Sequence, residues 1–294
     1  YKRAGRIARK ALGVGLSLVR AGASALEVCE AIEETISSLG ARPAFPPNIS
    51  VNEVAAHFSP MPGLDYRFRS GDIVKVDVGV HVDGFIADCA RTVALAPASD
   101  DIVRVAEEAL AVALRTLRSG VPLGRVGAEV ERLVRSRGYR PIENLTGHLM
   151  RRYELHAGKS VPNVRVLISD RAERDEVYAV EPFVTLPHAK GYVVDRWPPT
   201  IYRLLPRKPR GSLGECYDQI AELCGSLPFS PRWLVGVVAA SLERVMELLK
   251  ALVKKKCAMA YPMLVEASGA PVAQAEDTAI VLDRGVLITT RLTQ

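Results

Sequence analysis

The sequence predicts an α+β fold built from two related halves, each made of two helices followed by strands. An internal repeat supports this division, because a shift of 98 residues places 4–43 on 102–141 with 14 of 40 positions identical. Both copies carry apolar residues at helical spacing and end in Gly-x-Arg-Pro, and strand-like stretches follow each copy. We therefore expect one pseudo-symmetric unit, with a first half of about 1–97 and a second half of about 98–294.

Two helices are predicted in each copy of the repeat. The first helix has an apolar stripe at helical spacing, formed by Ile7, Ala8, Ala11, Val14 and Leu18. The second helix opens with a capping box, Ser24-x-x-Glu27, and stops at Gly40. Its counterpart in the second copy runs from about Pro122 to Gly138. The amphipathic stripe explains the start of the chain better than a secretory signal does.

The composition excludes several classes of protein. The 294 residues are 48% hydrophobic and 24% charged, which excludes a disordered chain and a coiled coil. No apolar run approaches the ~18 residues that span a bilayer, so we expect no transmembrane segment and no membrane partner. The five cysteines are odd in number and lack Cys-x-x-Cys spacing, which predicts a reducing compartment, here the cytoplasm.

A β-hairpin places two aspartates close together. Residues 73–82 alternate, with valines on one face and a second face formed by Lys75, Asp77, Gly79 and His81. The following Asp83-Gly84 is a two-residue turn, which pairs Gly79 with Asp88 and Asp77 with Ala90. Asp77 and Asp88 are then diagonal neighbours, roughly 7–8 Å apart. Gly79 is expected to leave room over Asp88.

Two carboxylates this close repel each other, and their burial is costly unless a cation compensates. A solvated strand face is the alternative, but the apolar run Phe85-Ile86-Ala87 predicts burial. The hairpin therefore favours a metal site.

The second half repeats this arrangement of acids. Glu181 ends a strand before Pro182, in the place of Asp77, and Glu276 is the candidate counterpart of Asp88. The interval is 11 residues from Asp77 to Asp88 but 95 from Glu181 to Glu276, so the second half contains an insert of 84 residues. His148 adds one nitrogen donor.

Several motifs together resemble those of type 2 methionine aminopeptidases, in the archaeal form. They are Pro43-Ala-Phe-Pro, Asn52-Glu-Val-Ala-Ala-His57, Asp77-Val-Gly-Val-His-Val-Asp-Gly-Phe-Ile-Ala-Asp88, Gly147-His148, Leu155-His-Ala-Gly158, Val180-Glu-Pro-Phe183 and Leu227-Pro-Phe with Arg232-Trp-Leu. The resemblance implies the pita-bread fold, in which two αα-β halves surround a curved antiparallel sheet. It also implies a single catalytic domain over 1–294, with a helical insert at about 203–264.

The resemblance implies a two-metal site that removes the initiator methionine from nascent proteins and peptides. Asp77 would chelate one ion, Asp88 and Glu276 would bridge both, and His148 with Glu181 would complete the other. Two ions can hold a hydroxide that attacks the scissile carbonyl, with Glu181 as the general base. Co, Mn, Fe and Zn all tolerate these ligands, so the metal is not determined.

The resemblance also implies roles for substrate-contacting residues. His156 would hydrogen-bond the substrate carbonyl as it becomes an oxyanion, and His57 would contact the amide nitrogen. Phe45, Leu155 and Phe183 are candidates to line the pocket for the methionine side chain, although each by itself also fits a plain core position.

One stretch departs from the family pattern. Methionine aminopeptidases usually have Phe before and His after the last glutamate ligand, whereas Ala275 and Asp277 flank Glu276 here. Glu-Asp-Thr is closer to prolidases, which makes an Xaa-Pro hydrolase the first alternative; the insert argues against it. A non-catalytic relative that contacts protein or RNA is the second alternative, and the presence of all five ligands argues against that.

The insert is the basic part of the chain. Residues 201–260 hold 10 Lys and Arg but 5 Asp and Glu, with Arg207-Lys208-Pro-Arg210 and Lys254-Lys255-Lys256 as the main clusters. A solvated helical face explains such clusters, and attraction to ribosomal RNA is the sharper hypothesis. The expected partners are thus a peptide or nascent chain that begins with Met and, through the insert, the ribosome; no DNA partner is expected.

Overall fold

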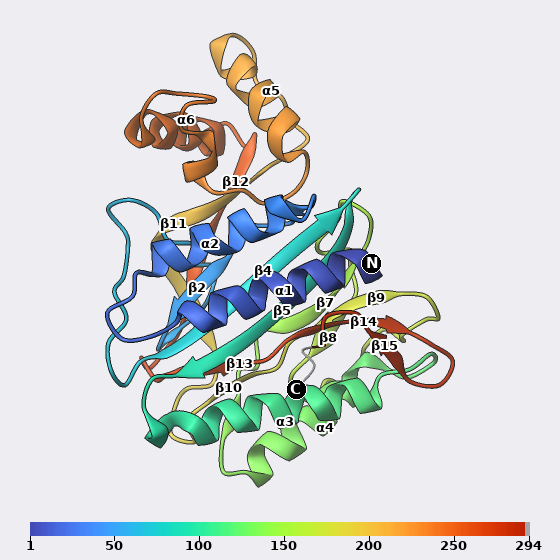
Figure 1. The fold of residues 1–294 in the computed structure, drawn as a ribbon. Helices are drawn as coiled ribbons and strands as arrows, with labels where there is room; N and C mark the ends of the chain where they lie inside the picture. Colours follow the sequence, from blue (N-terminus) through green and yellow to red (C-terminus); the bar gives the residue numbers. More distant parts are fainter. Residues whose placement is uncertain (292–294) are drawn as a thin grey trace.

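Two helix pairs flank a set of antiparallel strands in the computed structural model, which describes residues 1–291 (Figure 1). No helix in this range has the length and apolarity to cross a membrane. The helices are α1 (Lys2–Leu18), α2 (Ala25–Ser38), α3 (Asp100–Thr116), α4 (Leu123–Ser136), α5 (Ser212–Cys224) and α6 (Leu242–Lys254), with 3-10 turns η1 (Pro97–Ser99) and η2 (Pro231–Leu234). The predicted helix pairs of both repeat copies are therefore present.

Within residues 1–291 the strands form four antiparallel sheets. The first has the order β1-β4-β2, with β5 also paired to β4; the second has the order β15-β14-β9-β7-β8. Their bounds are β1 (Arg42–Pro43), β2 (Asn48–Val51), β4 (Ile73–Val82), β5 (Phe85–Ala94), β7 (Thr146–Met150), β8 (Ser160–Pro162), β9 (Val177–Val180), β14 (Asp277–Val281) and β15 (Val286–Ile288). The predicted α+β architecture is confirmed.

Two smaller sheets complete the strand framework, with the orders β13-β10-β6 and β11-β12-β3. Their bounds are β3 (Val54–Ala56), β6 (Arg140–Pro141), β10 (Phe183–Thr185), β11 (Val193–Leu204), β12 (Ala258–Glu266) and β13 (Val272–Gln274). The β11–β12 pair joins the second half to β3 of the first half.

The predicted hairpin register is confirmed. Gly79 pairs with Asp88 and Asp77 with Ala90 across β4 and β5. The reason for glycine at position 79 differs from the expectation, because a Cβ there would collide with the ring of Phe45. The space over the strand is therefore filled by an aromatic side chain of the first half and is not left open.

The two faces of β4 are buried for different reasons. Val74, Val76, Val78 and Val80 pack beneath α1 and α2 in a buried cluster that includes Leu12 and Ile32. On the other face Lys75 is also fully buried, and its Nζ donates to the backbone oxygen of Asn52 at 2.7 Å. Burial lowers the pKa of Lys75 to about 7, since a charged amine loses its water there. Asp77 lies on this same face.

Helix α2 begins at the predicted cap. Ser24 Oγ accepts a hydrogen bond from the backbone N–H of Glu27 at 3.1 Å, which satisfies a donor that the helix itself leaves free. Ser24 Oγ also donates to the Asp65 carboxylate at 2.9 Å. The cap thus attaches the start of α2 to the loop before β4.

The insert has its own core at one end of the molecule, where α5 and α6 lie beyond the ends of β11 and β12 (Figure 1). Its buried residues include Ile220 of α5, Leu249 of α6 and Phe229 between the two helices. A largely buried ion pair ties the insert to α2: both terminal nitrogens of Arg232 bind the Glu33 carboxylate, at 2.8 and 3.1 Å. Trp233 Nε1 donates to the same carboxylate at 2.9 Å.

We expect Glu33→Ala to destabilise the protein by about 3 kcal/mol, because it leaves the largely buried Arg232 without its partner. Urea unfolding followed by circular dichroism measures the change. Glu108→Ala is the matched control: it removes the more exposed pair with Arg137 and should cost less than about 1 kcal/mol. Equal effects of the two substitutions would contradict the role assigned to the Glu33 ion pair.

Candidate metal and substrate site

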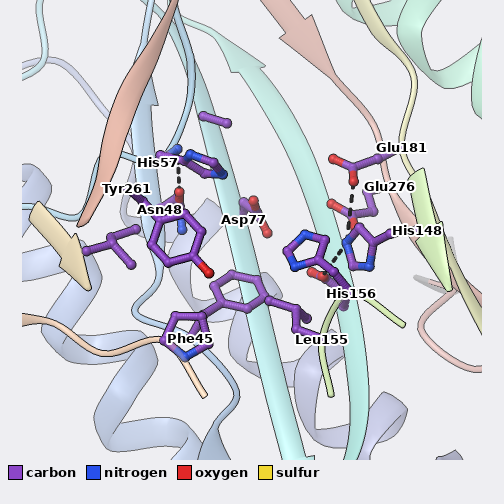
Figure 2. A pocket seen from close by; sticks show the side chains of 14 residues that line it. Phe45, Asn48, His57, Asp77, His148, Leu155, His156, Glu181, Tyr261 and Glu276 are labelled. Atoms are coloured by element: carbon purple, nitrogen blue, oxygen red, sulfur yellow. Dashed lines mark hydrogen bonds and ion pairs between the residues drawn. The ribbon is translucent and has the colours of Figure 1, made fainter. Parts of the chain in front are cut away.

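One cavity collects polar side chains from both halves of the chain (Figure 2). Asp77 lies on β4, Asp88 on β5 and His148 on β7, while Glu181 follows β9 and Glu276 lies between β13 and β14. The full lining consists of Phe45, Asn48, Ala56, His57, Asp77, Asp88, His148, Leu155, His156, Glu181, Ile201, Pro228, Tyr261 and Glu276. All five predicted ligands therefore line the same cavity.

The ligand atoms are close enough to share metal ions. Asp88, His148 and Glu276 each offer one donor atom, and these atoms lie within 4.8 Å of one another. His148 Nε2 is 3.7 Å from Asp88 Oδ2 and 3.5 Å from Glu181 Oε1. In Figure 2 Asp77 lies between these groups and His57.

Burial makes this cluster costly without a cation. Loss of water raises the pKa of Asp88, Glu181 and Glu276 well above the usual carboxylate range, and neighbouring acids add to the effect. Burial also raises the pKa of Asp77 to about 7. Burial, and then the charge of His156, keep the pKa of His148 well below its usual value, so its imidazole is neutral. Neutral imidazole and carboxylate are the forms that bind metals.

The donor set fits divalent metal ions. Four buried atoms of the predicted ligands have no hydrogen-bond partner among residues 1–291: Asp77 Oδ1, Asp88 Oδ1, Glu276 Oε1 and His148 Nδ1. Buried oxygens of this kind are normally hydrogen-bonded, and three of them that converge in one cavity fit the ligand set of a cation. A set of oxygens with one imidazole suits first-row divalent ions and lacks the thiolates of a structural zinc site.

Backbone pairing between the halves brings Asp88 and Glu276 together. Ala90 and Glu276 exchange backbone hydrogen bonds of 3.3 and 2.9 Å, which joins β5 to the segment before β14. Thr278 Oγ1 accepts from the backbone N–H of Asp88 at 2.7 Å and donates to its carbonyl at 2.8 Å. Gln274 Nε2 donates to Glu276 Oε2 at 3.0 Å. The ligands are thus held by pairing across the two halves.

The two departures from the family pattern lie outside the cavity. Asp277 is 3% exposed and forms a 2.9 Å ion pair with Arg91, which also donates to the Glu276 carbonyl at 2.6 Å. Asp277 Oδ1 accepts from Thr290 at 2.8 Å. Ala275 is fully buried in the core cluster that includes residues of α3. Asp277 therefore supports the Glu276 backbone from behind, and a larger residue at 275 would overpack the core without touching the cavity.

The two histidines expected to contact substrate lie on opposite sides of Asp77 (Figure 2). His57 has a left-handed backbone, φ 64°, held by a 2.7 Å hydrogen bond from its N–H to Asn48 Oδ1. Burial lowers the pKa of His57 to about 4, with a further contribution from His156. The His156 ring lies 4.3 Å from that of His148, centroid to centroid.

The apolar wall differs in part from the expectation. Phe45 and Leu155 line the cavity, but Phe183 does not: it is 1% exposed and packs in a core cluster with Ala55 and Ile142. A ring enclosed on all sides has no surface left for a substrate. Sequence reasoning missed other lining residues, which are Asn48, Ala56, Ile201, Pro228 and Tyr261. Ile201 and Tyr261 become neighbours only through the β11–β12 register, which the sequence does not reveal. The one available signal is that Tyr261 lies in a strand-like run of residues.

Curated relatives match nearly the whole chain. The methionine aminopeptidase of Methanocaldococcus jannaschii is 38% identical over 98% of this chain and 96% of its own length. That of Thermococcus onnurineus is 39% identical over 98% of this chain and 97% of its own length.

Solved structures confirm the predicted pita-bread fold. A thermophilic Arx1 has a TM-score of 0.84 at 17% identity, covering 100% of this chain and 90% of its own. The methionine aminopeptidase of Thermotoga maritima has a TM-score of 0.71 at 22% identity, and the match covers 99% of this chain and 95% of that one. The sequence model of the family described as Metallopeptidase family M24 matches residues 1–210. With the metal-ligand cluster and the similar full-length relatives, this match places the chain in metallopeptidase family M24.

Proposed function

We propose that this protein is an aminopeptidase that removes N-terminal methionine from peptides and nascent proteins with the help of divalent metal ions. The observation that carries the proposal is one cavity in which four carboxylates and His148 converge beside an apolar wall. The similarity to curated methionine aminopeptidases supports the choice of methionine. Both halves contribute ligands, which supports a single catalytic domain.

Asp77, Asp88, His148, Glu181 and Glu276 would hold two divalent ions. When bound, such ions polarise a carbonyl and lower the pKa of water, which are the two demands of peptide hydrolysis. The remaining chemistry belongs to the protein. Glu181 takes a proton from the attacking water and delivers it to the leaving amine, a task suited to a carboxylate whose proton affinity is raised by burial.

His156 and His57 orient the scissile bond in this proposal. His156 donates a hydrogen bond to the carbonyl oxygen as negative charge develops, and such a donor acts best when it is fixed beforehand. His57 stays neutral throughout the neutral pH range because its pKa is about 4. Its fixed backbone and the edge contact with the Tyr261 ring, 5.5 Å between centroids, hold it toward the substrate amide.

The pocket beside the metal ligands suits an unbranched apolar side chain. Phe45, Leu155, Ile201 and Tyr261 supply an apolar wall with two aromatic rings. A methionine thioether packs well against aromatic rings and adapts to irregular walls.

The helical insert supports assignment to the type 2 form. It extends beyond Leu204 of β11 and returns at Ala258 of β12, so the strands that supply Ile201 and Tyr261 also carry it. We assign the protein to the cytoplasm, where nascent chains are made. All five cysteines are free thiols in residues 1–291, in keeping with a reducing compartment.

Metal binding should separate the ligands from the substrate-contacting histidines. Asp88→Asn and His148→Ala should each weaken divalent metal binding at least tenfold, because each removes a donor from the cluster. His57→Ala should bind metal as the wild type does and lose turnover. Titration calorimetry with Mn²⁺ or Co²⁺, beside peptide hydrolysis, checks both statements. Wild-type metal affinity in Asp88→Asn would sink the ligand assignment.

A peptide panel distinguishes this function from its alternatives. The metal-loaded protein should release methionine from Met-Ala-Ser and leave Xaa-Pro peptides intact. Cleavage of Xaa-Pro peptides instead would identify an Xaa-Pro hydrolase, and loss of both activities would indicate a non-catalytic binding protein.

Glu181→Gln should reduce kcat by at least a hundredfold, since it removes the general base.

We propose that the basic insert attracts the ribosome. Arg207, Lys208 and Arg210 lie with the 254–256 lysines around one groove, so two segments of the insert combine their charge there. Lys208 is partly neutralised by a 2.6 Å ion pair with Asp218. Charge gathered in a groove supports salt-dependent attraction to the phosphates of RNA.

Replacement of all three lysines at 254–256 by Ala should reduce ribosome co-sedimentation, most strongly at low salt. The matched control replaces Arg115, Arg125 and Arg132 by Ala, three exposed charges on α3 and α4. Equal sedimentation of both triple variants and the wild type across a salt series would refute the ribosome proposal.

A further inference from the structure

A second cavity continues from the metal site. Its volume is about 270 Å³. It shares Leu155, His156, Pro228 and Tyr261 with the first cavity, and Tyr153, Glu154, Arg203 and Ser226 complete its lining. Because His156 lines both cavities, a peptide whose scissile carbonyl contacts His156 would place its following residues in the second cavity.

Strand geometry directs Arg203 into this cavity. Successive side chains of β11 point to opposite faces. Tyr202 and Leu204 belong to the buried core of the insert, whereas Ile201 lines the first cavity and Arg203 the second. The register pairs Ile201 with Tyr261, which places Tyr261 diagonally from Arg203 on the neighbouring strand.

Within residues 1–291, Arg203 has no partner for its charge. Its Nε is buried without a hydrogen bond, and no ion pair or side-chain hydrogen bond involves Arg203 within the described range 1–291. By contrast, two other largely buried arginines, Arg91 and Arg232, each hold a carboxylate, at 2.9 and 2.8 Å. A guanidinium left unpaired beside a cavity is costly, which indicates that its partner arrives with the substrate.

The charge of Arg203 is only weakly screened in the second cavity. Arg203 and His156 both line the second cavity, so the guanidinium lies beside the residue that is proposed to contact the scissile carbonyl. Glu154 also lines the second cavity, but its side chain is exposed and therefore screened by water and salt. Arg203 is only partly exposed, and its field is screened less.

We propose that Arg203 binds a carboxylate carried by the substrate beyond the scissile bond, so that the enzyme prefers acidic residues there. The carboxylate is a Glu or Asp side chain in the second residue after the scissile bond, or the free C-terminus of a tripeptide. This inference rests on the proposed aminopeptidase activity. A charge-assisted, often bidentate hydrogen bond to Arg gives roughly tenfold discrimination.

The test compares amidated peptides that differ in one residue. Wild-type kcat/KM should be about tenfold higher for Met-Ala-Glu-amide than for Met-Ala-Lys-amide, and the ratio should shrink in high salt. Arg203→Met should bring the ratio to within about twofold of one, and Arg203→Lys should restore part of it. Arg132→Met, a substitution of an exposed arginine of α4, should keep the wild-type ratio.

Further measurements distinguish a side-chain carboxylate from a C-terminal one. They also distinguish failure of the Arg203 proposal from failure of the aminopeptidase proposal. If kcat/KM is higher for Met-Ala-Ser than for Met-Ala-Ser-amide, and Arg203→Met removes this difference, the C-terminal carboxylate of the tripeptide binds Arg203. Efficient cleavage with a wild-type Glu-to-Lys ratio near one overturns the Arg203 proposal and leaves the aminopeptidase intact. Absence of cleavage of every Met peptide by the metal-loaded wild type overturns the aminopeptidase, and this inference with it. If Arg203→Met does not fold, the wild-type ratio and its salt dependence still decide.

Discussion

The burial of four carboxylates around one cavity is the constraint on which the rest of this structure depends. Asp77, Asp88, Glu181 and Glu276 repel one another, and burial raises the pKa of each. Such a cluster is stable only if a rigid framework holds it and cations compensate it. The antiparallel strands supply the framework, and metal ions of the kind used by the M24 family supply the charge.

That framework is built by pairing across the two halves. The Ala90–Glu276 bridge brings a ligand of each half together, and the Arg91–Asp277 pair secures the same peptide from outside the cavity. Residue 277, which departs from the family pattern, thus has a defined structural partner. The valine face of β4 beneath α1 and α2 fixes the other side of the cluster.

The insert contributes to the cavity walls beside the metal-ligand cluster. Its connecting strands, β11 and β12, carry Ile201, Arg203 and Tyr261, so the segment that distinguishes the two halves also shapes the cavity beyond the metal ligands. The Arg232–Glu33 pair anchors this segment to α2. The predicted metal ligands Asp77, Asp88 and His148 lie on other strands, so the metal cluster and this part of the cavity wall come from different parts of the chain.

The sequence alone determined the features that local rules specify. The turn Asp83-Gly84 set the register that pairs Gly79 with Asp88, because a two-residue hairpin permits only one alignment. The cap at Ser24 followed from side-chain reach, and the clustered acids predicted a metal site that the cavity bears out.

Only the tertiary structure decided which distant side chains meet. Phe183 fills the core, Phe45 occupies the space above Gly79, and Arg203 lines the second cavity without a partner among residues 1–291. No local pattern marks these outcomes, since each depends on contacts between segments far apart in the chain. Strand pairing such as Ile201 with Tyr261 is set by the packing of the whole sheet, and packing is a property that no window of sequence contains.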